Sequence, residues 1–226
     1  MSEVQFATDR SREAVLATNK VLRNTYMLLS MTLFFSAFMA GVAMVLDAPH
    51  MGLIVILPML GLLWGVHKLK DSVWGLAMVF AFTGFMGFTL GPILNYYLAM
   101  ANGTQVILMA LGLTAFTFLG LSGYALTTQK DFTFLRGFIS VGLMVALGAV
   151  AILLIGPLFG LYVPGLYLAY STALVLLASA LILFDTSRIV HGGQTNYLLA
   201  TVELYMDIYI MFTHLLHLLG VFGGDD

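Results

Sequence analysis

Long apolar runs alternate with short polar connections along this 226-residue chain from about residue 26 onward. A membrane-spanning helix needs ~20 predominantly apolar residues, and the runs are about that long. None of them shows the apolar–polar alternation of a half-buried strand. The pattern therefore predicts an all-α integral membrane protein with seven transmembrane helices, at residues 26–46, 51–66, 73–98, 105–126, 134–155, 165–184 and 197–219. The second run is short and contains Pro58, so we expect it to be kinked.

The positive charges fall on one side of the membrane when seven helices are counted. They precede the first helix or lie in the second-to-third, fourth-to-fifth and sixth-to-seventh connections: Arg10, Arg12, Lys20, Arg23, Lys68, Lys70, Lys130, Arg136 and Arg188. Because cytoplasmic loops carry the excess of Lys and Arg, we expect the N-terminus in the cytoplasm and the C-terminus outside. A count of six or eight helices would place these charges on both sides.

Residues 1–23 precede the first apolar run and contain four of the nine Lys and Arg residues. Apolar side chains between these charges favour a short amphipathic helix at the membrane interface, but a solvated, partly disordered tail fits equally well. No cleavable signal peptide is recognisable, so we expect the first run to remain as a signal anchor. These boundaries predict a cytoplasmic tail at 1–23, a transmembrane domain at 24–220 and a short external tail at 221–226.

The composition agrees with this class, since 61% of the residues are hydrophobic and 9% are charged, against roughly 25% charged in soluble domains. The absence of cysteine excludes disulfides, thiolate metal sites and cysteine nucleophiles. We expect a lipid bilayer as the surroundings and no nucleic-acid partner. Gly87 and Gly91 have the spacing of close helix contacts. Packing within the chain is favoured over a dimer contact, so we expect a monomer or a weak homo-oligomer.

The last apolar run carries four ionisable residues on one side. At ~100° per residue, Glu203, Asp207, His214 and His217 fall on a stripe roughly 80° wide. A charged group at mid-bilayer costs at least ~2.5 kcal/mol, so this stripe must face protein or water. Asp207 lies about ten residues into the run, or ~15 Å along a helix, which is mid-bilayer.

Each acidic residue has a structural alternative. Asp185, near the end of the sixth run, is either functional or an interfacial carboxylate close to Arg188. Asp207 is either functional or a buried carboxylate held by a neighbouring Tyr or Ser, and Glu203 is open between the same alternatives. A turn near residues 192–193 would bring Asp185 closer to Glu203 than to Asp207.

Converging carboxylates in a low-dielectric place cannot all be ionised, so they would share protons. Such a group can act as a proton-operated latch between helices. It also offers the hard oxygen ligands that Ca²⁺ prefers, so Asp185 and Asp207 are candidate calcium ligands. We expect acid and calcium to compete there, and no resident cofactor.

The remaining chemistry of the sequence is weaker. His214 and His217 lack a recognisable third zinc ligand, and packed or interfacial histidines are favoured over a zinc site. Two membrane aspartates could activate water as in an intramembrane protease, but the specific motifs are missing. The last helix has no lysine for a retinal Schiff base. We expect a protein that is not an enzyme.

Four segments of the chain resemble the Bax-inhibitor (TMBIM) family and, within it, the bacterial YccA-like branch. They are KVLRNTY (20–26), FAFTGFMGFTLGPILN (80–95), LTTQKDFTFLRG (126–137) and LFDTSRIVHGGQTNY (183–197). The resemblance implies a seven-helix fold with the last helix central, in the bacterial inner membrane.

The resemblance also implies a pH-sensitive calcium leak channel. The family's gating aspartate pair corresponds to Asp185 and Asp207, and Glu203 fills the acidic position one turn before the second aspartate. Some members have a basic partner near the second helix, which lacks arginine here and offers only His67, Lys68 or Lys70. Accessory candidates are therefore Lys68, Arg188 and His214.

The YccA-like branch implies an alternative role. It modulates FtsH, a membrane-anchored AAA protease that grips such proteins by their cytoplasmic N-terminal tail. FtsH is therefore the expected protein partner of this chain, through residues 1–23.

Overall fold

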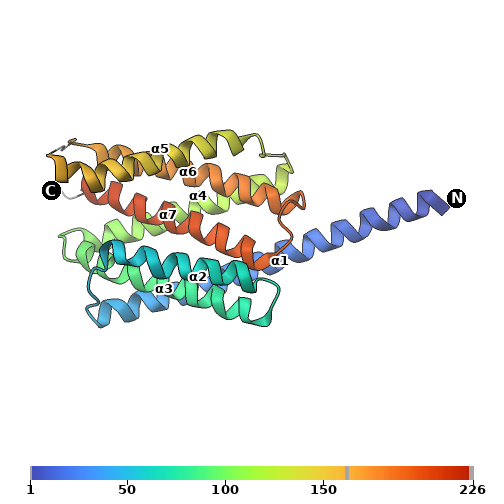
Figure 1. The fold of residues 1–226 in the computed structure, drawn as a ribbon, viewed down its shortest axis with the longest axis horizontal. Coiled ribbons are helices and arrows are strands. Elements are labelled where there is room, and N and C mark those ends of the chain that lie inside the picture. Colours follow the sequence, from blue (N-terminus) through green and yellow to red (C-terminus); the bar gives the residue numbers. More distant parts are fainter. Residues whose placement is uncertain (1, 161–162, 224–226) are drawn as a thin grey trace. The chain divides into compact units, whose positions relative to one another are not determined.

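The computed structural model describes residues 2–160 and 163–223, with side chains from Leu16 onward. Its helices are α1 (Ser2–Val45), α2 (Ile56–Leu69), α3 (Val73–Leu98), α4 (Gly103–Thr128), α5 (Leu135–Ile155), α6 (Leu166–Val190) and α7 (Tyr197–Gly223), shown in Figure 1. Two short 3-10 helices, η1 (Gly52–Val55) and η2 (Gly156–Phe159), accompany them, and no strand occurs in the described residues. Seven helical segments are long and apolar enough to cross a membrane. The predicted all-α fold with seven membrane helices is thus confirmed, while its orientation stays a prediction.

The chain divides into two compact units. The first unit consists of Met1–Asn95 and Ser187–Tyr205, and the second of Tyr96–Thr186 and Met206–Asp226. The helices α6 and α7 each contribute residues to both units. The central place expected for the last helix stays a prediction.

In the first unit, glycines let α3 lie directly against α1. A Cβ atom on Gly87 would collide with the backbone oxygen of Ser36, and one on Gly91 would collide with Cβ of Ala43. Side chains larger than hydrogen would hold the two helices apart. The glycine pair therefore packs within the chain. This is the alternative that the sequence analysis favoured over a dimer contact.

The helix α1 differs from both forms expected for residues 1–23. Its backbone is helical from Ser2, and it continues without a break into the membrane segment Leu16–Val45. The reason lies in the sequence, because no proline occurs in α1 and its first glycine is Gly41. Without a residue that ends a helix, the N-terminal segment has no place to separate from the membrane helix.

The start of α2 and the end of α7 differ in detail from the predicted helix boundaries. Pro58 lies in the first turn of α2, directly after η1. Backbone N–H groups in a first turn have no acceptor within the helix, so a proline there removes no hydrogen bond. At the other end, residues 221–223 continue α7, and the rest of the predicted tail at 221–226 lies outside the described residues.

In the second unit, α5 packs on α6 through Ile139, Leu174 and Leu177, with Gly142 facing the Leu177 side chain. The helix α4 buries one stripe of residues three or four apart: Val106, Ala110, Thr114, Phe118, Ser122 and Ala125. Most of the surface of α5 is exposed and apolar. Such a surface requires apolar surroundings.

Candidate functional site

The connection between α6 and α7 folds back on the end of α6. Gly192 has a φ of +72°, a conformation that favours glycine. The backbone N–H groups of Gly193 and Gln194 then donate to the carbonyl oxygen of Arg188, at 2.8 and 3.1 Å. This turn satisfies a carbonyl group that the end of α6 would otherwise leave open. It also turns the Gln194 side chain inward, where it is buried.

Glu203 is held by residues of this connection. The Gln194 Nε2 atom donates to both carboxylate oxygens, Oε1 at 3.0 Å and Oε2 at 3.1 Å. Arg188 places Nη1 3.5 Å from Oε2, and the two charged side chains are 30% and 31% exposed. The sequence had singled out Arg188 and Glu203 but not Gln194. The glutamine lies in the segment HGGQTN, and only the turn at Gly192 shows that it reaches Glu203.

Asn196 joins this connection to the one between α2 and α3. Its Oδ1 atom accepts the backbone N–H groups of Leu198 and Leu199 and so caps α7. Its Nδ2 atom donates to the Lys70 carbonyl oxygen at 3.0 Å and to Asp71 Oδ1 at 3.3 Å. These two connections are among those that the charge count places on the same side of the membrane.

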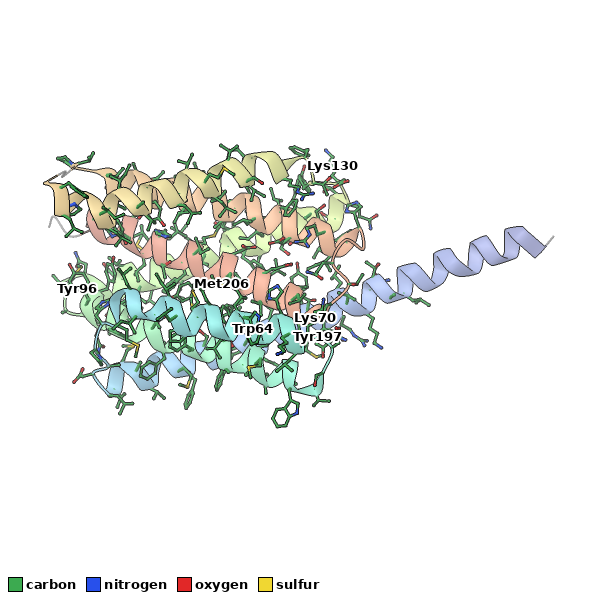
Figure 2. All side chains as sticks on the ribbon, in the orientation of Figure 1. Trp64, Lys70, Tyr96, Lys130, Tyr197 and Met206 are labelled. Atoms are coloured by element: carbon green, nitrogen blue, oxygen red, sulfur yellow. The ribbon has the colours of Figure 1, made fainter. Side chains whose placement is uncertain are left out.

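Asp185 and Asp207 are both buried in the second unit, with exposed fractions of 6% and 3%. Asp207 follows Met206, which is labelled on α7 in Figure 2. Glu203 and Arg188 belong to the first unit. The structure thus groups the two aspartates in one unit and gives Glu203 partners in the other. That Asp185 lies closer to Glu203 than to Asp207 stays a prediction.

The backbone around Asp185 is fixed by its two neighbours in sequence. Thr186 Oγ1 donates to Ser122 Oγ of α4 at 3.4 Å, with both hydroxyl groups buried. Phe184, on the other side, packs against the α5–α6 core. The carboxyl group of Asp185 is therefore attached to a part of α6 that is packed from two directions.

Tyr205 lies two residues before Asp207 and was not singled out by the sequence. Its hydroxyl donates to the Thr83 carbonyl oxygen at 3.1 Å and lies 2.7 Å from Ser36 Oγ. Because the phenol has one hydrogen, which goes to Thr83, the Ser36 hydroxyl must donate to Tyr205. The ring is 1% exposed. This contact joins α7 to α1 and α3 within the first unit.

The two histidines of α7 are packed against α6. His214 Nδ1 lies 3.1 Å from Ser171 Oγ, and its ring meets Tyr170 edge to face. The His217 ring meets Tyr167 in the same way, with ring centroids 4.2 Å apart. No group of three or more His, Asp or Glu side chains that could hold a metal ion occurs in the described residues. Both histidines thus make ring contacts with tyrosines of α6.

Lys68 is the accessory candidate on α2. Its Nζ atom lies 4.7 Å from the centroid of the Trp64 ring, one turn earlier on the same helix. This is the geometry of a cation–π contact. The contact seen for Lys68 is thus with an indole ring of its own helix.

Comparison with known proteins agrees with the resemblance noted in the sequence. The family model described as "Inhibitor of apoptosis-promoting Bax1" matches residues 18–224. The uncharacterized protein PA2604 of Pseudomonas aeruginosa is 47% identical over the whole of both chains. The modulator of FtsH protease YccA of Escherichia coli K12 is also 47% identical, over 97% of this chain and 98% of its own.

A second Escherichia coli relative, of strain O6:H1, is named inner membrane protein YccA and matches with the same identity and coverage. This name supports the predicted location in the bacterial inner membrane. The names of these relatives describe membrane proteins or uncharacterized proteins and no enzyme. With seven membrane-spanning helices and a family match over nearly its whole length, the chain belongs to the Bax-inhibitor family of membrane proteins.

Proposed function

We propose that this chain modulates a membrane-bound protease of the FtsH type. The observation that carries the proposal is the 47% identity to the relative named as a modulator of that protease. The match extends over 97% of this chain and 98% of the relative. The two proteins therefore correspond over nearly their whole length, and not only in one domain.

The form of α1 suggests how the protease would be engaged. Residues 2–15 form a helix that precedes the membrane segment Leu16–Val45 and extends beyond the ends of α2 and α3 (Figure 1). A protease that takes hold of this segment would have to extract α1 from its close contact with α3. Extraction is opposed by the packing at Gly87 and by the hydrogen bond between Ser36 and Tyr205. The chain would then occupy the protease for longer than an ordinary substrate does.

The test measures the half-life of an FtsH membrane substrate in cells that express the chain. The full chain should lengthen this half-life, and a variant lacking residues 2–15 should not, although it reaches the same level in the membrane. The Asp185→Asn variant is the matched control and should act like the full chain. Equal half-lives with the full chain and the shortened chain would contradict the proposal.

A second candidate function is a proton-sensitive cation leak, and the two buried aspartates favour it. A carboxyl group in a membrane is costly to ionise, and Asp185 and Asp207 are both buried in the second unit. Their protonation would therefore be coupled to the packing of α6 and α7. Calcium would act as a permeant or transiently bound ion, with carbonyl oxygens and water completing its shell.

This second function is tested by calcium flux into liposomes that contain the purified chain and a calcium dye. Asp207→Asn and Asp185→Asn should change the flux and flatten its dependence on pH. Asp131→Asn, a change at an exposed carboxyl in the α4–α5 connection, is the control and should leave both unchanged. If Asp207→Asn behaves like the control, the leak is not gated by this pair.

A further inference from the structure

The helix α2 is attached to its unit by few side chains. Val66 is its one buried residue, and Gly65 approaches Met78 of α3 closely enough that a Cβ atom would lie 3.2 Å from the sulfur. Away from this contact, Leu57 is 76% exposed and Leu60 is 51% exposed. This side of α2 requires apolar surroundings over much of its length.

Four exposed residues of α2 lie on one side of the helix. At ~100° per residue, Leu57, Leu60, Trp64 and Lys68 fall within a stripe roughly 80° wide. We call this stripe the α2 lipid face. It extends ~16 Å along the helix, which is about half of the ~30 Å hydrocarbon thickness of a bilayer. It begins with two leucines, continues with the indole of Trp64, which is 64% exposed, and ends with an ammonium group.

This face ends at Lys68, and Lys70, two residues on, lies on the other side of the helix end. Lys68 lies over the Trp64 ring, and Lys70 follows at the end of the helix, toward the same end as Trp64 in Figure 2. Asp71 is the neighbouring acidic residue, but its Oδ1 atom accepts a hydrogen bond from Asn196. In the described part of the chain, neither lysine forms an ion pair. Both ammonium groups are exposed and available to an anion.

A second tryptophan lies at the same end of the unit. Trp74, just after the α2–α3 connection, is 70% exposed. Exposed tryptophans gather where the hydrocarbon of a membrane meets the headgroups. The two indoles therefore place Lys68 and Lys70 at the depth of the lipid phosphates, with Leu57 and Leu60 at the depth of the acyl chains.

We propose that the α2 lipid face binds an anionic phospholipid. Its phosphate would lie at Lys68, where the ammonium group donates charge-assisted hydrogen bonds to phosphate oxygens. Lys70, at the end of the same helix, would add to the local positive charge. One acyl chain would lie along Leu60 and Leu57. A zwitterionic lipid carries a cation of its own beside the phosphate, so it gains less from the lysines. Each lysine should favour the anionic lipid by about fivefold, equivalent to the ~1 kcal/mol that a basic side chain gains at an anionic surface.

The chain offers a direct probe of this site, because Trp64 and Trp74 are its only two tryptophans. Trp74→Phe leaves Trp64 as the single tryptophan, within the proposed site, and excitation at the red edge of the absorption selects it over the tyrosines. The purified full-length variant is placed in phosphatidylcholine vesicles that contain increasing fractions of brominated phosphatidylglycerol or brominated phosphatidylcholine. Bromine quenches a nearby indole, so the ratio of the two quenching curves gives the preference for the anionic lipid. We expect a preference of at least severalfold.

In the same background, Lys68→Gln with Lys70→Gln should reduce the preference to about one. Lys70→Gln alone keeps the contact of Lys68 with Trp64 and should retain an intermediate preference. Lys20→Gln with Lys130→Gln removes the same charge elsewhere and should leave the preference unchanged. Because each variant is compared with itself in two lipids, a change in Trp64 emission does not affect the result.

Three outcomes would overturn the proposal. One is equal quenching by the two lipids in the parent variant, and another is a preference that survives the loss of both lysines. The third is no quenching by either lipid, which would mean that a second copy of the chain covers the face.

Discussion

The hydroxyl of Tyr205 lies 2.7 Å from the hydroxyl of Ser36, 169 residues earlier in the chain. The same phenol donates to the backbone of Thr83, so three helices of the first unit meet at one buried oxygen atom. This arrangement fixes α7 two residues before Asp207. A buried polar contact of this kind should matter for stability, because removing one partner leaves a buried polar group with one hydrogen bond fewer.

Tyr205→Phe should destabilise the protein by about 1–2 kcal/mol, since it removes the hydrogen bonds that join its hydroxyl to Ser36 and to the Thr83 carbonyl. The measurement is thermal or denaturant unfolding of the purified protein in detergent. Tyr124→Phe is a suitable control, because Tyr124 is 46% exposed and its ring contact with Phe132 needs no hydroxyl. Equal stability of both variants would show that the Tyr205 hydroxyl contributes nothing.

Gly87→Ala should destabilise the first unit by about 1–3 kcal/mol, the usual effect of overpacking. The added Cβ would meet the backbone oxygen of Ser36, which cannot move without displacing α1. Gly112→Ala is the matched control, because a Cβ there meets nothing within 4 Å. In the interior of α4 the control should be neutral or stabilising by up to ~1 kcal/mol. A loss of stability in the control as large as in Gly87→Ala would contradict this account.

Gln194→Ala should loosen the α6–α7 connection. It removes both hydrogen bonds from Nε2 to the Glu203 carboxylate. A hydrogen bond to a charged group contributes about 1.5–3 kcal/mol to stability. Backbone amides of residues 191–196 should then exchange with deuterium faster in native-state mass spectrometry. Gln105→Ala, at an exposed position of α4, is the control and should leave the exchange of residues 191–196 unchanged. Unchanged exchange at 191–196 would mean that the turn at Gly192 is sufficient by itself.

Removal of divalent metal ions should not change the stability of the folded protein, because we expect no metal ion at the two histidines of α7. His214 and His217 are packed against Tyr170 and Tyr167, and no third ligand joins them in the described residues. Addition of EDTA should therefore shift the melting temperature by less than the error of the measurement, and so should micromolar zinc. A zinc-dependent rise in the melting temperature that His214→Asn abolishes would show a metal site instead.

The helices and the buried positions could be predicted because their signals are local. Each apolar run has the length that lipid requires, and a carboxyl at Asp207 cannot face hydrocarbon. The beginning of α1 was harder, since amphipathic and disordered segments share a composition and only the continuity of the helix distinguishes them.

The contacts of the site could not be predicted in the same way. Gln194 reaches Glu203 because Gly192 adopts a positive φ. A glutamine in a connection between helices does not by itself indicate such a contact. The partners of Tyr205 are 122 and 169 residues away in the chain. No periodicity in a single sequence encodes which helices are neighbours, so contacts of this range follow from the fold alone.

The unbroken course of α1 has a mechanical consequence. A pull on residues 2–15 meets no flexible joint before the buried part of the helix. The force is therefore transmitted along the helix axis, and the contacts with α3 are loaded in shear and together, instead of being peeled apart one after another. A helix loaded in this way resists a motor until many contacts fail at once, so the stiffness of α1 itself would set how long a pulling protease stalls.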